Sequence, residues 1–243
     1  MGKDGPGAGA AVRVQPLKPP PDRLYGRQRG HKLRARQQRL LDVTLPRLRF
    51  DPAQAADPLA PFPGCTELWL EVGFGSGEHA EAQVASHPHA GLIASEVFET
   101  GLCSLLSRLV PDGAEDTAPV PPNLRVWPDD ARTLLRSLPP AGLSRLFLLF
   151  PDPWPKARHA KRRFVHPEVV RDAARVLRPG GMWRIATDDP TYQDWVTQVM
   201  GNQPWFTNPP PVAARPPDWP PTRYEAKALT AGRHPRYWEL TRV

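Results

Sequence analysis

The sequence has only two cysteines and no long apolar run. Cys65 and Cys103 are too few for a disulfide framework and lack the spacing of zinc ligands, so we expect free thiols in a reducing cytoplasm. The purest apolar stretch, Leu146 to Phe150, falls far short of the roughly 18 residues of a membrane span. The N-terminus also lacks the apolar core of a signal peptide. These absences predict a cytoplasmic protein that does not bind a membrane.

Length and composition predict a folded domain with a basic lead-in. Of the 243 residues, 40% are hydrophobic and 23% are charged, which excludes a wholly disordered chain. Residues 1–50 hold 12 Lys and Arg against three Asp, a balance of +9, which leaves −2 for the rest of the total of +7. A nearly neutral body with a basic arm indicates a polyanionic partner. From the charge balance alone, a solubilising tail explains the basic residues equally well.

The chain divides into three parts. Residues 1–22 are rich in Gly, Pro and Ala without an apolar period, and we expect them to be disordered. Residues 23–50 form a basic arm, in which 37–45 read as a short amphipathic helix that ends before a proline. The main domain spans 51–243 and begins with a proline-broken linker over 51–64.

Strand and helix patterns alternate along the main domain. This alternation predicts an α/β fold of three layers, with a mostly parallel sheet and helices on both faces. Residues 202–221 read as a long proline-rich loop. The sequence predicts strands at 67–72, 91–94, 124–127, 144–150, 182–186 and 237–241, and helices at 78–85, 98–109, 131–138, 167–177 and 192–200.

Three alternating glycines follow the first strand, at Gly73, Gly75 and Gly77. Ligands of such sheets lie outside the carboxyl ends of the strands, and glycines allow the backbone to approach them closely. An ordinary turn between a strand and a helix rarely needs three glycines. The loop therefore predicts a nucleotide or nucleoside site.

Acidic residues around this loop indicate which ligand it takes. The third glycine comes one residue too early for a dinucleotide fingerprint, and Glu78 occupies the fingerprint position. Glu71, Glu78 and Glu96 would gather negative charge, which suits a sulfonium with an amino group better than a pyrophosphate. Glu96 ends the second strand and is placed to accept both ribose hydroxyls. We expect S-adenosylmethionine, with a dinucleotide as the weaker alternative.

The fourth strand ends in a Pro-Asp-Pro-Trp segment. Two prolines hold Asp152 rigidly at the edge of the sheet, and Trp154 offers a surface on which a base could stack. Residues 156–163 contain five Lys and Arg, which would meet phosphates. The alternative is a proline-stiffened loop that ends in a solvated run of charge.

Several strings in this order resemble one family. EVGFGSGEH, FPDPWPKARHAKRRF, ATDD after LRPGG and TRYEAKAL are similar to the bacterial tRNA (guanine-N7-)-methyltransferases of the TrmB family. The lead-in GRQRGHKLRARQQRLLD is also similar, so the resemblance covers roughly residues 23–243. Pro155 stands where some members have His, and Arg223 where Lys is frequent.

The resemblance implies a class I methyltransferase fold and methyl transfer from S-adenosylmethionine to N7 of guanosine 46 in the tRNA variable loop. Asp152 is then the catalytic candidate, and the doublet Asp129-Asp130 favours Asp130 as a cofactor contact. Asp188 could instead cap the next helix, and Glu225 could be a surface acid of a loop. Implied cofactor residues are Glu71, Gly73, Gly75, Gly77, Glu96, Asp130 and Asp152; implied substrate residues are Lys156, Asp188, Thr222, Arg223, Tyr224 and Glu225.

Two other functions remain open from the sequence. The chain could be a class I methyltransferase for a different RNA, a protein or a small molecule, or a non-catalytic RNA-binding relative. The arginine-rich segment argues against the former, and the full set of acids argues against the latter. The seven His show no metal-ligand pairing, so no metal is expected. The oligomeric state, monomer or homodimer, is left open.

Overall fold

A six-stranded sheet in the order β3-β2-β1-β4-β5-β6 forms the centre of the protein. The computed structural model describes Gly30 and residues 32–243, so the expected disordered tail at 1–22 lies outside the described residues. Neighbouring strands from β3 to β5 pair in parallel, and β6 pairs antiparallel with β5, which confirms the mostly parallel sheet. The strands are β1 Glu67–Val72, β2 Ala90–Ser95, β3 Leu124–Trp127, β4 Leu143–Leu149, β5 Leu177–Thr187 and β6 Arg236–Thr241.

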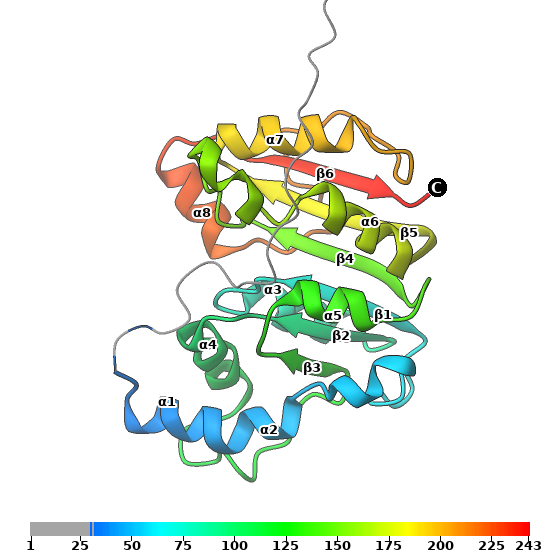
Figure 1. Ribbon diagram of the computed structural model, residues 1–243. Helices are drawn as coiled ribbons and strands as arrows, with labels where there is room; N and C mark the ends of the chain where they lie inside the picture. The colour runs from blue at the N-terminus through cyan, green and yellow to red at the C-terminus, as the bar shows by residue number, and fades with distance from the viewer. Residues whose placement is uncertain (1–29, 31) are drawn as a thin grey trace, which may run out of the picture.

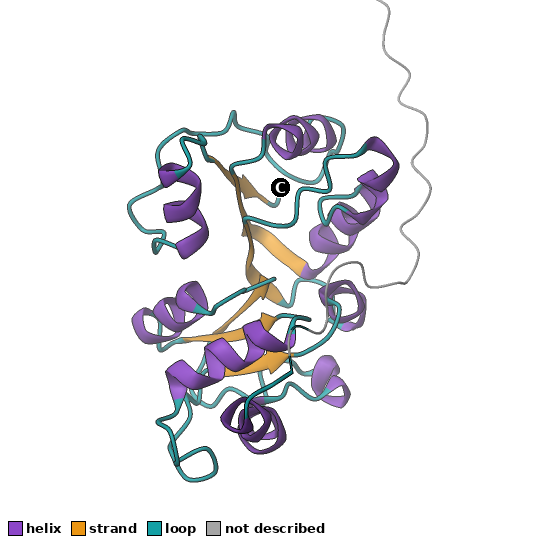
Figure 2. Ribbon diagram, turned by 90° about the vertical axis from the view of Figure 1, so that its left-hand side faces the viewer, coloured by secondary structure: helices purple, strands orange, loops and turns teal. Residues whose placement is uncertain are grey.

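Helices cover both faces of this sheet (Figures 1 and 2). Core residues of α3 and α4 pack with one face, and those of α5, α6 and α7 pack with the other. The α-helices are α1 Ala35–Arg39, α2 Leu45–Leu48, α3 Glu78–Ser86, α4 Glu99–Leu109, α5 Ala131–Ser137, α6 Pro167–Val176, α7 Pro190–Met200 and α8 Arg223–Thr230; η1 Leu40–Thr44 is a π-helix, and η2 Pro52–Ala56 and η3 Ala157–Arg162 are 3-10 helices.

Strand β1 shows why four of its six residues are apolar in an almost continuous run. Leu68, Leu70 and Val72 belong to the core on one face, whereas Trp69 belongs to the core on the other. A central parallel strand is buried on both faces, so it reads as a continuous apolar run rather than an alternation.

The helix expected to end before Pro46 continues through it. The π-helix η1 precedes α2, and the backbone N–H of Leu45 donates to the carbonyl of Leu40, five residues back. Pro46 has no N–H to donate, and it follows directly on the π-helical turn, where the hydrogen bonds reach five residues back. The predicted end was therefore wrong, because the helix passes through the proline with a π-helical turn just before it.

The segment that follows this helix is part of the core rather than a free connection. The backbone N–H of Phe50 donates to the carbonyl of Val126 at 2.9 Å, beside β3. Phe62 is 2% exposed and lies over Gly91, where a Cβ would come within 2.5 Å of its ring. The stretch 51–64 thus covers the sheet despite its prolines.

Three helices were absent from the sequence predictions: α8 and the 3-10 helices η2 and η3. Strand β5 also begins earlier than predicted, at Leu177. In the part of the chain that the structure describes, no helix has the length and apolarity needed to cross a membrane.

Candidate active site

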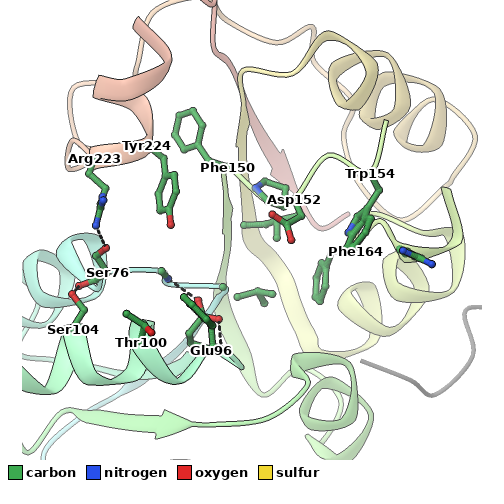
Figure 3. A pocket seen from close by; sticks show the side chains of 18 residues that line it. Ser76, Glu96, Thr100, Ser104, Phe150, Asp152, Trp154, Phe164, Arg223 and Tyr224 are labelled. Carbon is green, nitrogen blue, oxygen red and sulfur yellow. Dashed lines mark hydrogen bonds between the residues drawn. The ribbon is translucent and has the colours of Figure 1, made fainter. Parts of the chain in front are cut away.

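A cavity of about 730 Å³ opens at the carboxyl ends of β1, β2 and β4. Its volume falls within the usual range for small-molecule sites. The strand order reverses between β1 and β4, which is where ligands bind in open α/β sheets. Figure 3 shows the glycine loop and α4 on one side and the Pro-Asp-Pro-Trp segment on the other. The predicted position of the ligand site thus coincides with a real cavity.

The glycine loop has the backbone geometry that only glycine adopts easily. Gly73, Gly75 and Gly77 have φ angles of +70°, +61° and +85°. A Cβ on Gly75 would lie 2.8 Å from the ring of Tyr224, whereas one on Gly73 would meet no atom within 4 Å. Gly77 is packed against Leu105 and does not line the cavity. The loop therefore offers open space at Gly73 and close packing at the other two glycines.

Glu96 lines the cavity and is held by the backbone around it. Its carboxylate accepts from the N–H of Gly75 at 2.9 Å, of Val97 at 2.8 Å and of Phe98 at 3.0 Å. Burial raises the pKa of this carboxyl, and the charge of Asp152 raises it further, against the lowering effect of the three N–H groups. A carboxylate has about four acceptor positions, so room remains for a ligand hydroxyl.

The Pro-Asp-Pro-Trp segment presents Asp152 to the cavity on a strained backbone. Phe150 and Trp154 have φ angles of +51° and +45°, in the region that non-glycine residues rarely adopt. Arg163 is 6% exposed and donates to the carbonyls of Pro153 at 3.1 Å and Trp154 at 3.0 Å. Such strain persists where surrounding contacts fix the chain, and it concentrates at functional sites.

Trp154 and Phe164 form an aromatic wall on this side of the cavity, whereas the ring of Phe150 extends toward Tyr224 (Figure 3). The guanidinium of Arg162 lies 4.8 Å from the centre of the Trp154 ring. Arg162 thus belongs to the cavity, and Arg163 is buried. Three of the five cations in 156–163 are exposed to solvent: Lys156, Arg158 and Lys161.

Helix α8 carries the Thr-Arg-Tyr-Glu motif to the opposite side of the cavity. Thr222 is the N-cap of the helix and accepts from the N–H of Glu225 at 3.1 Å. Arg223 donates to the hydroxyl of Ser76 in the glycine loop at 2.6 Å. Tyr224 faces the cavity, and burial raises the pKa of its phenol. The motif therefore caps a helix and brings two side chains to the site.

Glu225 is neither at the cavity nor on the surface. It is 7% exposed, accepts from the hydroxyl of Tyr237 at 2.6 Å and pairs with Arg215 at 3.1 Å. The alternative reading of Glu225 as a surface acid of a loop was wrong, because it lies in a helix whose inner side packs on β6.

Four other predicted site residues lie away from the cavity wall. Glu71 is buried beside His79, and Asp130 caps α5 and pairs with Arg132. Asp188 pairs with Arg233, and its neighbour Asp189 provides the cap of α7 instead. Lys156 is exposed and does not line the cavity. The predicted residues that do line the cavity are Gly73, Gly75, Glu96, Asp152, Arg223 and Tyr224.

Several lining residues were not singled out from the sequence. Ser76, Phe98, Thr100 and Gly101 come from the glycine loop and the start of α4. A Cβ on Gly101 would lie 2.6 Å from the carbonyl oxygen of Gly75, so that glycine allows α4 to approach the loop. Their position directly after the first and second strands is a signal that could have identified them. Among the described residues, no group of His, Cys, Asp and Glu could hold a metal ion.

Comparison with known proteins gives a consistent family match. A family model described as "Putative methyltransferase" matches residues 66–237. The chain is 63% identical over 227 residues to the tRNA (guanine-N(7)-)-methyltransferase of Granulibacter bethesdensis, with 93% of this chain and 97% of the relative covered. It is 47% identical to the enzyme of the same name from Rhodospirillum rubrum, with 91% and 89% covered.

Solved structures support the fold at low sequence identity. The 16S rRNA methyltransferase KamB has a TM-score of 0.50 and 16% identity, with 74% of this chain and 90% of that chain covered. An antibiotic-related methyltransferase has a TM-score of 0.52 and 10% identity, with 80% and 95% covered. Together with the sheet order, these similarities assign the class I methyltransferase fold.

Proposed function

Because the chain belongs to the family of tRNA (guanine-N(7)-)-methyltransferases, we propose that its cavity brings S-adenosylmethionine together with guanosine 46 of the tRNA variable loop. The enzyme transfers a methyl group from S-adenosylmethionine to N7 of a guanine in tRNA. The observation that carries the proposal is one cavity that joins Glu96, Asp152 and an aromatic wall beside a basic segment.

The residues of the cavity fit S-adenosylmethionine. The open space at Gly73 lets a nucleoside approach the backbone, and Glu96 retains an acceptor position for a ribose hydroxyl. No Lys or Arg comes from the glycine loop, and Glu78 lies in the first turn of α3, which disfavours a pyrophosphate there. When bound, this cofactor supplies an electrophilic methyl group on a sulfonium. We propose that Glu71 and Asp130 also support its binding.

Catalysis requires alignment more than proton transfer. N7 of guanine has a free lone pair, so the enzyme needs no general base before the attack. The rigid placement of Asp152 can hold the base in line with the methyl group. The purine gains positive charge as N7 is methylated, and a carboxylate nearby stabilises that charge. Asp152 can also accept from N1–H or N2–H of the guanine.

The aromatic wall and the exposed cations give the substrate two kinds of contact. Trp154 and Phe164 offer flat surfaces for a base that has been turned out of the tRNA stack. Lys156, Arg158 and Lys161 are exposed on the segment that follows Trp154 and can meet the tRNA backbone. Substrate roles for Thr222 and Glu225 act through the fold of α8, whereas Arg223 and Tyr224 face the site directly. Asp188 contacts the substrate as well, once its ion pair with Arg233 has broken.

The same proposal includes the organisation and the location of the protein. Residues 23–50 form a basic RNA-binding arm ahead of a methyltransferase domain at 51–243, and the enzyme works in the cytoplasm, where tRNA is processed.

The test is methylation of defined tRNA transcripts. Purified protein with S-adenosylmethionine should form 7-methylguanosine at position 46, as read by mass spectrometry of nuclease fragments. A transcript with adenosine at that position should remain unmethylated. Methylation of the altered transcript, or of free guanosine at an equal rate, would overturn the proposed substrate.

A further inference from the structure

A buried histidine contacts Glu71 beneath the glycine loop. His79 and Glu71 are 3% and 2% exposed, and Nδ1 of the imidazole lies 3.0 Å from Oε2 of the carboxylate. Both atoms are buried, and among the described residues neither has a hydrogen-bond partner, because their mutual contact lacks hydrogen-bond geometry. Each is therefore the close polar neighbour of the other, and a small turn of the ring would let the imidazole donate to the carboxylate.

The contacts of His79 determine where its proton lies. Nε2 of the ring lies 3.0 Å from the amide nitrogen of Gln83, one helical turn further along α3. An amide nitrogen can only donate, so Nε2 of the histidine accepts. The proton of the neutral ring is then on Nδ1, which faces the carboxylate. Gln83, His79 and Glu71 thus form a chain of contacts, in which the imidazole N–H is the donor that lies 3.0 Å from the carboxylate of Glu71.

The position of Glu71 connects this chain to the cavity. Glu71 lies two residues before Gly73, whose backbone borders the open space, and Val72 between them also lines the cavity. A glutamate side chain has three rotatable bonds, so a carboxylate without a partner has no fixed orientation. When such a carboxylate is buried, the missing hydrogen bond also costs free energy. With the imidazole N–H beside one oxygen, the other oxygen is left for a ligand.

We propose that His79 is a positioning residue for cofactor binding: it fixes the carboxylate of Glu71 so that its second oxygen meets the amino group of S-adenosylmethionine. This inference rests on the proposed function, because it assigns Glu71 to that ligand. The positioning role of His79 can be separated from packing, although the centre of its ring also lies 4.9 Å from the centre of the Phe147 ring. Packing needs the size of the ring, whereas positioning needs the N–H.

Calorimetric titration of S-adenosylmethionine into the full chain tests this proposal. His79→Leu keeps apolar bulk and removes the donor, so it should weaken binding about tenfold, as expected for the loss of a hydrogen bond to a charged group. His79→Asn keeps an N–H near the position of Nδ1 and should recover most of the affinity. Val84→Ala is the control, since Val84 is a buried residue of the same helix. It should lower the melting temperature without changing the affinity.

A double-mutant cycle separates an effect through Glu71 from a general one. In a Glu71→Gln background, His79→Leu should have little further effect on the affinity, because the group that it positions is already changed. Full additivity, or unchanged affinity in His79→Leu, would overturn the proposal. If the His79 variants do not fold, Gln83→Leu carries the test: it should weaken binding severalfold, and unchanged affinity would count against the chain of contacts. Binding of S-adenosylmethionine without methylation of tRNA would reject the proposed function and leave this inference standing.

Discussion

At the scale of single residues, Asp152 is set apart by the backbone on either side of it. Phe150 and Trp154 both have positive φ angles, and such residues cost on the order of 1–3 kcal/mol each. The contacts that hold this strained backbone also fix the position of Asp152 between the two residues. The strain therefore supports a role in aligning the base.

We expect Asp152→Asn to reduce kcat for tRNA methylation more than tenfold, which corresponds to about 1.4 kcal/mol of barrier. The amide keeps the size of the side chain but removes the charge that stabilises the methylated purine. Single-turnover rates with saturating tRNA would measure this. Asp116→Asn, at an exposed acid far along the chain, is the matched control. Retention of more than about a tenth of the rate would argue against Asp152 as the catalytic residue.

Glu96 should make cofactor binding depend on pH. Burial raises the pKa of its carboxyl, so the ligand-free protein takes up a proton at a higher pH than an ordinary glutamate does. The ionised form accepts the ribose hydroxyl, so affinity should fall as the pH is lowered through that pKa, and binding should release a proton. The ligand-free protein should also lose stability as the pH rises through the same window, because the folded state holds the proton more tightly than the unfolded chain does.

Calorimetry of S-adenosylmethionine binding between about pH 8 and pH 5 checks this expectation. Glu96→Gln should bind more weakly at the upper end of this range and show a flatter dependence. The same slope in the variant and the parent protein would assign the titration to another group.

At the scale of secondary-structure elements, the loop after β4 depends on a residue of the segment that follows it. Arg163 joins the carbonyls of Pro153 and Trp154, and its guanidinium lies 4.7 Å from the centre of the Trp195 ring on α7. The planar guanidinium of Arg163 thus connects the strained loop to α7. The arginine is structural, although its sequence context suggested a phosphate contact.

Arg163→Lys should lower kcat severalfold or more and leave the Kd for S-adenosylmethionine nearly unchanged. Lysine has a single point of donation and cannot serve both carbonyls or stack as a plane. Steady-state kinetics with separate variation of tRNA and cofactor would show this split. Arg171→Lys, at an exposed position on α6, should change neither value. An increase confined to the KM for tRNA would instead return Arg163 to the RNA-binding surface.

Helix α8 shows how a local signal can be hidden by its surroundings. The pattern Thr-Arg-Tyr-Glu has the form of a capping box, with a threonine three residues before a glutamate. The prolines just before it favoured a continued loop. The cap at Thr222 forms, but Glu225 turns to Tyr237 and Arg215, so its role is set by tertiary partners.

At the scale of the whole molecule, the basic arm divides into two parts with different uses. Arg36 and Arg39 pair with Glu115 at 3.3 and 3.5 Å, and Glu115 is 1% exposed. These arginines attach α1 to the body of the protein and are not free for RNA. Arg23, Arg27 and Arg29 lie outside the described residues and are the candidates for phosphate contacts.

Deletion of residues 1–31 should therefore raise the KM for tRNA and reduce the salt dependence of binding. Each lost phosphate contact should make the log–log salt slope shallower by about 0.7–0.9. The affinity for S-adenosylmethionine should not change, because the cavity lies in the following domain. Filter binding at several salt concentrations would measure the slope, with deletion of residues 1–22 as the control that keeps those three arginines. An unchanged slope after the longer deletion would reduce the arm to a solubilising tail and assign the RNA contacts to 156–163.

The sequence by itself determined the fold class, the positions of the strands along the chain and the position of the site. Apolar runs with a fixed period must be buried, so the strands could be located before any contact was known. Glycines with positive φ and prolines around Asp152 restrict the backbone locally, so the glycine loop and the loop after β4 were visible for the same reason.

Tertiary structure alone decided which partner each charged group near the site contacts. Glu71, Asp130 and Asp188 are acids at strand ends like Glu96 and Asp152, yet each pairs with a different residue: His79, Arg132 and Arg233 respectively. Arg36 and Arg163 read as RNA contacts and prove to hold the fold together. The role of a charged side chain depends on which partner the folded chain places close to it. That partner can lie anywhere along the chain, so local spacing does not determine it.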